Sequence, residues 1–335
     1  MRASGKPRWK DTMRHRIGFA AILVTIFGHY SDRVQAADQA SASVKVPEKI
    51  IIDTDIGDDI DDAFAVALAL QSPEVRIVGF STVSGDTTAR AKILDEMLGQ
   101  SDHKDIPVTA GNPANLPFTT TQYIGRQGRF GEKGRFAKAT HPPAVEFILE
   151  QIHRFPDQIT LVAIGPLTNV GSLIDKDPQA FRRLKRVVMM GGSIAAGYDE
   201  AIKVAVPEYN ILSDIPSAQK LFQSGVPIYL MPLDSTAQLK FDEVKRAALF
   251  YQASPLTDSL ALLYLLSGIT TPVLYDPMVV AFVIDPQLCP VEPMHIVVDQ
   301  KGVTRSEPGA PNAQVCLHSD PDTFFRFYMK RFVAP

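Results

Sequence analysis

The sequence is poor in several features that mark other classes of protein. No segment rich in Gly, Ser or Pro separates two parts of the chain, and there is no internal repeat, which argues against a multidomain or repeat architecture. The apolar run over residues 17–28 has only 12 residues and is too short to span a bilayer comfortably. The only two cysteines, Cys289 and Cys316, leave open whether a disulfide forms or both stay inert thiols.

The N-terminus has the sequence pattern of a secretory signal. Residues 1–16 contain six Lys or Arg and one acidic residue, the apolar run follows, and Val34-Gln35-Ala36 ends in a small residue. This order is typical of a signal peptide that is cleaved near Ala36, and an uncleaved membrane anchor is the alternative. We therefore expect a signal peptide over 1–36, a catalytic domain over 37–335 without a stable anchor, and a periplasmic or secreted location.

The rest of the chain is acidic. Residues 1–36 hold seven basic and two acidic residues, so 27 of the 34 basic and 35 of the 37 acidic residues remain, a net charge of −8. Such a balance argues against nucleic acid as a partner. The remaining 299 residues are sufficient for one large hydrophobic core.

Short β-branched runs alternate with amphipathic stretches, which predicts a single-domain α/β fold with an open, mostly parallel sheet flanked by helices. The expected strands cover residues 49–52, 75–83, 106–110, 159–164, 186–190 and 227–231. The expected helices cover residues 61–71, 87–98, 143–155, 167–174, 215–224, 241–251, 256–266 and 276–284. Several strands end in polar or glycine-rich turns, which should converge on one site because ligands bind at the carboxyl ends of parallel strands.

One stretch, residues 119–136, has no regular pattern. It contains four glycines together with Arg126, Arg129, Lys133 and Arg135. Either a mobile lid that contributes cations to a site or a solvated surface loop is compatible with this composition.

Six aspartates lie within residues 53–62, directly after the apolar run 49–52. Two carboxylates about 5 Å apart repel by roughly 3 kcal/mol at an effective dielectric of about 20, so such a cluster needs bulk water or a cation. Ca²⁺ suits it, because this ion accepts six to eight oxygen ligands in irregular geometry.

Three other interpretations of this motif are weaker. An EF-hand loop that starts at Asp53 would need Gly and Glu where Asp58 and Phe64 stand. A phosphatase of the haloacid-dehalogenase type would begin with the same Asp-x-Asp, but Gly57 stands where it expects Thr or Val. Capping of a helix N-terminus would need only one or two of the acids.

The motif instead resembles the Asp-x-Asp-x-Gly-x-Asp-Asp-Ala signature of the inosine-uridine preferring nucleoside hydrolases. Four further motifs of that family follow in order: Gly165-Pro166-Leu167-Thr168-Asn169, Met190-Gly191-Gly192, Glu208-Tyr209-Asn210 and Asp276-Pro277. The resemblance spans residues 50 to about 285. It implies Ca²⁺-dependent hydrolysis of the N-glycosidic bond of ribonucleosides or related N-ribosides, and relatives that tend to be homodimers or homotetramers.

The resemblance also implies roles for particular residues. The Ca²⁺ ligands would be Asp55, Asp62, the backbone carbonyl of Ile164, and Asp276. Asp55 would also be the general base that activates the attacking water. The ribose and the base would be bound by Asp61, Asp86, Met190, Glu208, Asn210 and Tyr275, although Met190 could equally be a core residue at a strand end.

Four departures from the family pattern concern mainly the base half of the site. Asp53 and Asp61 are eight residues apart where six is usual, so Asp58 or Asp59 could join the metal ligands. Asp86 replaces an Asn, and residues 193–206 hold about four extra residues. Tyr275 stands where many relatives have a His that protonates the leaving base, so it is either a leaving-group acid or an aromatic wall.

Two functions of other classes remain as alternatives. A non-catalytic periplasmic protein that binds nucleosides or ribose would use the metal for recognition only, and it would release no free base. A haloacid-dehalogenase-type phosphatase would depend on Mg²⁺ and release phosphate.

Overall fold

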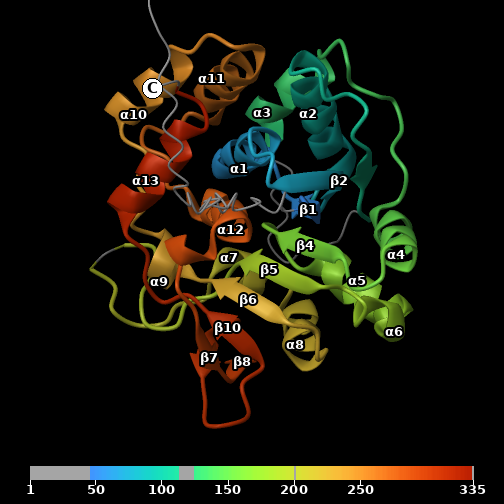
Figure 1. The fold of residues 1–335 in the computed structure, drawn as a ribbon, viewed down its shortest axis with the longest axis vertical. Coiled ribbons are helices and arrows are strands. Elements are labelled where there is room, and N and C mark those ends of the chain that lie inside the picture. Colours follow the sequence, from blue (N-terminus) through green and yellow to red (C-terminus); the bar gives the residue numbers. More distant parts are fainter. Residues whose placement is uncertain (1–45, 113–123, 200, 334–335) are drawn as a thin grey trace, which may run out of the picture. The chain divides into compact units, whose positions relative to one another are not determined.

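The central sheet has the strand order β3-β2-β1-β4-β5-β6-β10-β7, and all strands up to β10 run parallel. The computed structural model describes residues 46–112, 124–199 and 201–333, and Figure 1 shows the arrangement. The antiparallel edge strand β7 pairs with β10. The strands are β1 (Glu48–Thr54), β2 (Val75–Thr82), β3 (Val108–Ala110), β4 (Ile159–Ala163), β5 (Arg186–Met190), β6 (Ile228–Met231), β7 (Glu292–Met294) and β10 (Ala313–Val315).

Helices cover both faces of this sheet. The helices between β1 and β6 are α1 (Asp61–Leu70), α2 (Thr87–Gln100), α3 (Ile124–Glu132), α4 (Ala144–Arg154), α5 (Thr168–Lys176), α6 (Pro178–Phe181), α7 (Tyr209–Ser213) and α8 (Ile215–Gln223). The later elements are α9 (Leu233–Thr236), α10 (Glu243–Phe250), α11 (Pro255–Ser267), α12 (Tyr275–Ile284), η1 (Pro286–Leu288) and α13 (Pro321–Lys330), with the small hairpin β8 (Ile296–Val298) and β9 (Thr304–Ser306). The predicted parallel α/β fold is confirmed.

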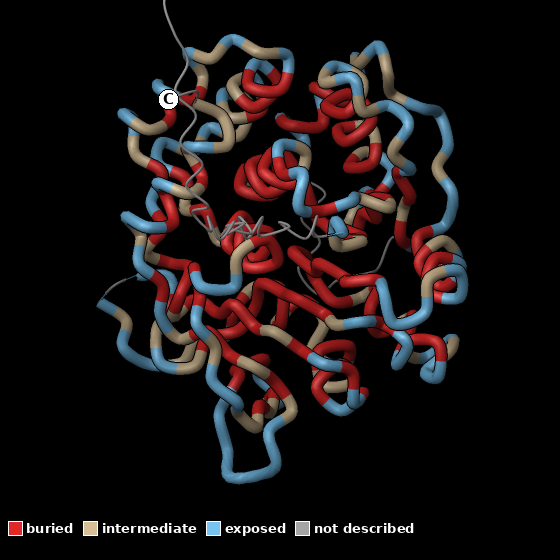
Figure 2. The backbone as a smooth tube through the Cα atoms, in the orientation of Figure 1, coloured by how far each residue is buried: buried red, intermediate tan, exposed pale blue. Residues whose placement is uncertain are grey.

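Alternation along β1 divides the core into two layers. Ile50 and Ile52 face a cluster that contains α1, α2, α11 and α12, whereas Ile51 faces α4, α5 and α8. Each side of the strand is apolar because both faces of a parallel sheet are covered by helices. Figure 2 shows that the strands of the sheet and the helices next to it are largely buried.

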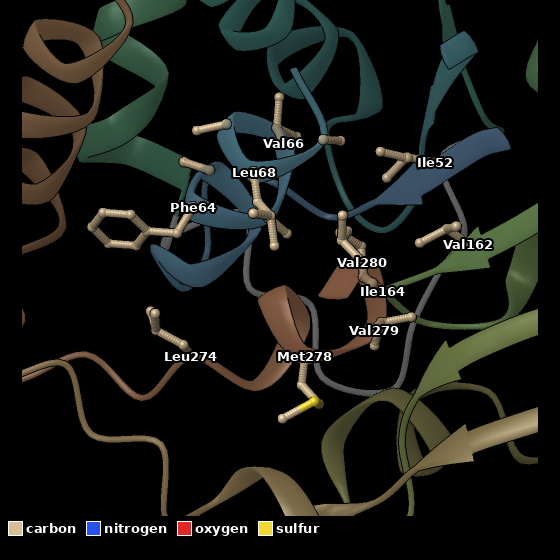
Figure 3. Close-up of a cluster of buried hydrophobic side chains, with 14 of the residues drawn as sticks. Ile52, Phe64, Val66, Leu68, Val162, Ile164, Leu274, Met278, Val279 and Val280 are labelled. Atoms are coloured by element: carbon tan, nitrogen blue, oxygen red, sulfur yellow. The ribbon is translucent and has the colours of Figure 1, made fainter. Parts of the chain in front are cut away.

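The helices α1 and α12 lie against each other at the centre of one layer. Every residue of α12 except Tyr275 is buried, and α1 is buried over residues 61–69. A helix that is apolar on all sides belongs in a core. Figure 3 shows Phe64 and Leu68 of α1 with Met278 and Val280 of α12 in one cluster with side chains of the sheet.

The irregular stretch predicted over 119–136 is corrected in its described part, because residues 124–132 form α3. The buried residues Ile124, Gln127, Gly128 and Gly131 recur at the spacing of one helix face, and Ile124 and Phe130 pack against the core. Arg126 and Arg129 are exposed, so this helix contributes no cation to the cavity described below.

The predicted signal peptide over 1–36 lies outside the described residues, and no helix among the described residues is long and apolar enough to cross a membrane.

Cys289 and Cys316 form a disulfide that joins the end of η1 to the end of β10. The bond closes a loop whose ends are 27 residues apart. Because this cross-link restricts the unfolded chain, reduction should lower the free energy of unfolding by about 3–4 kcal/mol. Urea unfolding with and without dithiothreitol measures the loss. The double variant Cys289→Ser/Cys316→Ser should unfold like the reduced protein and should not respond to the reductant; equal midpoints for oxidised and reduced wild type would contradict the prediction.

Candidate active site

A cavity of about 620 Å³ opens at the carboxyl edge of the sheet, where the strand order reverses between β1 and β4. Ligands of open α/β sheets bind at such a switch point. The cavity is lined by Asp55, Asp58, Asp59, Asp61, Asp62, Ile164, Met190, Tyr198, Glu208, Tyr209, Asn210, Leu212, Ser267, Ile269, Tyr275 and Asp276. The ends of β1, β4 and β5 therefore meet at this cavity, as predicted, whereas the turn after β2 does not line it.

The first aspartate of the motif, Asp53, holds the turns together and does not line the cavity. Its Oδ1 accepts hydrogen bonds from Ser81 Oγ at 2.6 Å and from Asn169 Nδ2 at 2.8 Å. Burial raises the pKa of Asp53 to about 6, and these two hydrogen bonds oppose the shift. Asp53 thus ties the end of β1 to β2 and to the start of α5.

Asp55 lies where two glycines leave room. Gly57 has φ +108°, a conformation that side chains disfavour, and it turns the chain just after Asp55. A Cβ on Gly165 would lie 2.9 Å from Asp55 Oδ1, so the turn after β4 approaches this carboxyl closely only because residue 165 is glycine. These two turns place Asp55 at the cavity wall.

Two helix N-termini bring three further carboxyls together. Asp61 and Asp62 begin α1, Asp276 lies in the first turn of α12, and one ligand atom from each lies within 4.8 Å of the others. The Asp276 backbone N–H donates to Asp61 Oδ2 at 3.1 Å, and Thr54 Oγ1 donates to Asp62. Carboxylates are favoured at helix N-termini, where the helix dipole is positive.

These acids are buried without an equal number of cations. Asp61, Asp62 and Asp276 are 2–4% exposed, and burial, followed by repulsion among the acids, raises the pKa of each well above its usual range. Burial raises the pKa of Asp55 to about 8, although the nearby Arg90 opposes the shift. A bound cation would restore the charged forms, because opposite charge favours ionisation. The cluster therefore fits a metal ion.

Arg90, on α2, does not line the cavity but places a positive charge against the carboxylate turn. Its guanidinium donates to the Ser84 carbonyl at 2.7 Å, to the Ile56 carbonyl at 3.1 Å and to the Asp55 carbonyl. It also pairs with Asp58 Oδ2 at 2.8 Å. Sequence reasoning missed Arg90, which fixes the backbone of the extended carboxylate turn.

The two acids of the extended turn lie apart from the group of three. Asp58 pairs with Arg90, and its buried Oδ1 has no hydrogen-bond partner. Asp59 Oδ1 accepts from the Ile60 N–H at 2.7 Å, while Gln127 of α3 donates to the carbonyls of Asp58 and Asp59. Both carboxyls line the cavity but are not part of the cluster of Asp61, Asp62 and Asp276.

Glu208 and Asn210 lie at the start of α7. Glu208 accepts from the backbone N–H groups of Gly192, Asn210 and Ile211 at 2.8–3.2 Å, so it joins the end of β5 to this helix. Burial still raises its pKa, against those hydrogen bonds. Asn210 Nδ2 donates to the Met190 carbonyl at 3.3 Å. Met190, Glu208 and Asn210 all line the cavity.

Tyrosines from separate segments surround the outer part of the cavity. The rings of Tyr198 and Tyr275 meet edge to face with centroids 6.3 Å apart. The Tyr198 hydroxyl accepts from the Tyr209 backbone N–H at 2.7 Å. Asp234 anchors the segment that carries Tyr198, because its carboxylate accepts from Ile194 and Ala195 at 2.8 Å each. Burial raises the pKa of Tyr198 and of Tyr275, and nearby carboxylates raise both further.

Most of the predicted site residues meet in this cavity, and one does not. The lining includes Asp55, Asp61, Asp62, Ile164, Met190, Glu208, Asn210, Tyr275 and Asp276. Asp86 is exposed, caps α2 by accepting from the Ala89 N–H at 2.9 Å, and does not line the cavity. The cluster of three carboxyls contains Asp61, which was expected at the ribose, whereas Asp55 lies beside this cluster. Tyr198 was missed, although the extra length of residues 193–206 pointed to this segment.

The sequence of residues 50–326 matches the model of the inosine-uridine preferring nucleoside hydrolase family. The chain belongs to this family.

The individual proteins to which the chain is similar include nucleosidases and nucleoside hydrolases. The chain is 32% identical to uridine nucleosidase 1 of Arabidopsis thaliana over 58% of this chain and 59% of that protein. It is 30% identical to the pyrimidine-specific ribonucleoside hydrolase RihA of Citrobacter koseri over 76% of this chain and 84% of that protein. The solved purine-preferring ribonucleoside hydrolase from Gardnerella vaginalis shares the fold, with a TM-score of 0.75 and 22% identity over 85% of this chain and 98% of that one. The matched segments span 59–65% of the length of four curated relatives.

Proposed function

We propose that this protein hydrolyses the N-glycosidic bond of ribonucleosides or related N-ribosides, with Ca²⁺ as its metal. The observation that carries the proposal is the close group of Asp61, Asp62 and Asp276 in the same cavity as Asp55. Membership of the nucleoside hydrolase family supports the reaction class.

The donor set favours a hard cation. Asp61, Asp62 and Asp276 offer only carboxylate oxygens, Ile164 lines the same cavity, and Asp58 Oδ1 is buried without a partner. Ca²⁺ is bound by oxygen ligands in irregular arrangements, whereas Zn²⁺ is usually bound by nitrogen and sulfur ligands. This set of oxygen ligands therefore suits Ca²⁺ better than Zn²⁺. Asp55, Asp62, Asp276 and the Ile164 carbonyl remain the proposed ligands, with Asp61 as a further candidate from the geometry.

The chemistry assigns distinct tasks to the residues. A water oxygen would bond to C1′ of the ribose as the C1′–N bond breaks and its electron pair leaves with the base. Asp55 would accept the proton of that water as the general base. A bound Ca²⁺ would orient the water and make it easier to deprotonate. The surrounding carboxylates would stabilise positive charge that grows on the ribosyl group only in the transition state.

The remaining assignments complete the proposal. Glu208, Asn210 and Asp61 would hold the ribose hydroxyls, Met190 would line the sugar side, and Tyr275 would contact the base. The N-terminal segment 1–36 would direct export to the periplasm or the exterior. A homodimer or homotetramer is proposed from the family resemblance alone.

Release of free base tests the proposal. Inosine, uridine, cytidine, adenosine and nicotinamide riboside are incubated with the enzyme, with and without EGTA, and products are separated by chromatography. We expect free base and ribose with Ca²⁺, and more than a hundredfold less after EGTA. The melting temperature should fall on chelation, since a ligand that binds only the folded state stabilises it. Nucleoside binding without cleavage would instead identify a binding protein, and full activity in a metal-free sample would reject the Ca²⁺ assignment.

A further inference from the structure

The cavity is unusually acidic for a pocket that takes a small aromatic ligand. Seven of its lining residues are Asp or Glu, and no Lys, Arg or His lines it among the described residues. Arg90 does not line the cavity, since its guanidinium is bonded to Asp58 and to backbone carbonyls. One divalent cation together with Arg90 adds three positive charges, fewer than the carboxyl groups present. A cavity of this kind attracts cations and repels phosphorylated ribosides.

The carboxyls and the tyrosines of the cavity differ in how deeply they are buried. Asp61, Asp62 and Asp276 are 2–4% exposed, whereas Tyr198 is 43% exposed. A ribose whose hydroxyls meet the buried carboxyls therefore directs its base outward, toward the rings of Tyr198 and Tyr275. Aromatic faces attract positively charged groups as well as other aromatic rings.

The outer end of the cavity offers a leaving base little help. A neutral purine or pyrimidine departs as an anion unless a proton donor reaches it. The described outer wall presents phenols, whose ordinary pKa is near 10, the Ser267 hydroxyl, which is a still weaker acid, and the apolar Leu212 and Ile269.

We propose that the preferred substrates are N-ribosides of a positively charged heterocycle, such as pyridinium ribosides. This inference rests on the proposed hydrolysis and names its substrate class. In the step, water oxygen bonds to C1′ while the C1′–N bond breaks, and the bonding pair neutralises the ring nitrogen. The products are ribose, a neutral pyridine and one proton, which Asp55 takes from the water. The leaving base needs no proton, and its positive charge matches the carboxylates and tyrosine rings.

Kinetics on matched ribosides test the leaving-group half of this inference. The probes are nicotinamide riboside, its uncharged 1,4-dihydro form, inosine and uridine, all with the Ca²⁺-loaded enzyme. We expect kcat/KM for nicotinamide riboside to exceed that for inosine and uridine at least about a hundredfold, with no cleavage of the dihydro form. Inosine or uridine cleaved within tenfold of nicotinamide riboside would overturn the inference and leave the proposed hydrolysis intact. No free base from any riboside would overturn both.

Binding of fragments tests the charge half without relying on turnover. 1-Methylnicotinamide carries the pyridinium charge, and 3-methylbenzamide is its neutral counterpart of the same shape. Measured by calorimetry, the cation should bind at least tenfold more tightly, and Tyr198→Leu should reduce this preference several-fold. Tyr251→Leu is the control, because Tyr251 is 88% exposed and lies outside the cavity. Equal affinities for the two fragments in the wild type, or an unchanged preference in Tyr198→Leu, would contradict the proposed role of charge and of this ring.

Discussion

Asp55→Asn should lower kcat by roughly a hundredfold or more while the protein stays folded, as expected when a positioned general base is removed. The amide has the size of the carboxyl and fits the space beside Gly165, but it cannot accept the proton of the attacking water. Burial already disfavours the charged form of Asp55, so the neutral amide should not weaken the fold. Steady-state rates and thermal unfolding measure the two effects.

The metal has to be followed in the same sample, because Asp55 is also a proposed ligand. Ca²⁺ content is determined by elemental analysis, and rates are compared only between metal-replete proteins. Asp86→Asn serves as the matched control, since Asp86 is exposed, caps α2 and lies outside the cavity. Near wild-type turnover in metal-replete Asp55→Asn would show that another group is the base, with Asp59 the next candidate.

Arg90→Met should lower the free energy of unfolding by about 3–5 kcal/mol, the range for breaking a buried ion pair from one side. The side chain of Arg90 is 2% exposed and that of Asp58 14%. The substitution leaves Asp58 unpaired and removes the donor to the carbonyls of Ser84 and Ile56. Urea unfolding followed by circular dichroism measures the change.

Two further variants show whether the loss comes from this pair. Asp58→Asn in the Arg90→Met background should recover part of the stability, because the unpaired charge is gone. Arg183→Met removes an arginine from the exposed pair with Asp157 and should leave the midpoint almost unchanged. If Arg90→Met lowered the free energy of unfolding as little as Arg183→Met does, a structural role for Arg90 would be contradicted.

Local patterns in the sequence predicted the sheet and most of its helices. The strand expected over 186–190 is present with the same bounds, and the helices expected over 61–71 and 276–284 begin within one residue of α1 and α12. Buried β-branched runs and apolar helices carry this information within a few neighbouring residues. In α3 the pattern failed, because the helix contains three glycines, which are weak helix formers, and two of them lie on its buried face in place of apolar side chains.

The missed parts of the site depend on contacts between distant segments. In the sequence, Arg90 looks like an ordinary polar residue of an amphipathic helix. The Asp55 carbonyl that it contacts lies 35 residues earlier in the chain. Tyr198 belongs to a segment whose anchor, Asp234, follows 40 residues after Ile194. Motif resemblance located the family's carboxyls but could not position residues that the family signature does not contain.

The hydrogen bond between the start of α12 and the start of α1 joins residues 215 positions apart in the chain. During synthesis the carboxyls of Asp61 and Asp62 therefore emerge long before Asp276, their third partner. A contact of such sequence separation forms late, after the intervening loop has been closed. If this cluster binds the proposed metal ion, a nascent chain that ends before α12 lacks one of the three carboxyls and cannot yet form the complete site.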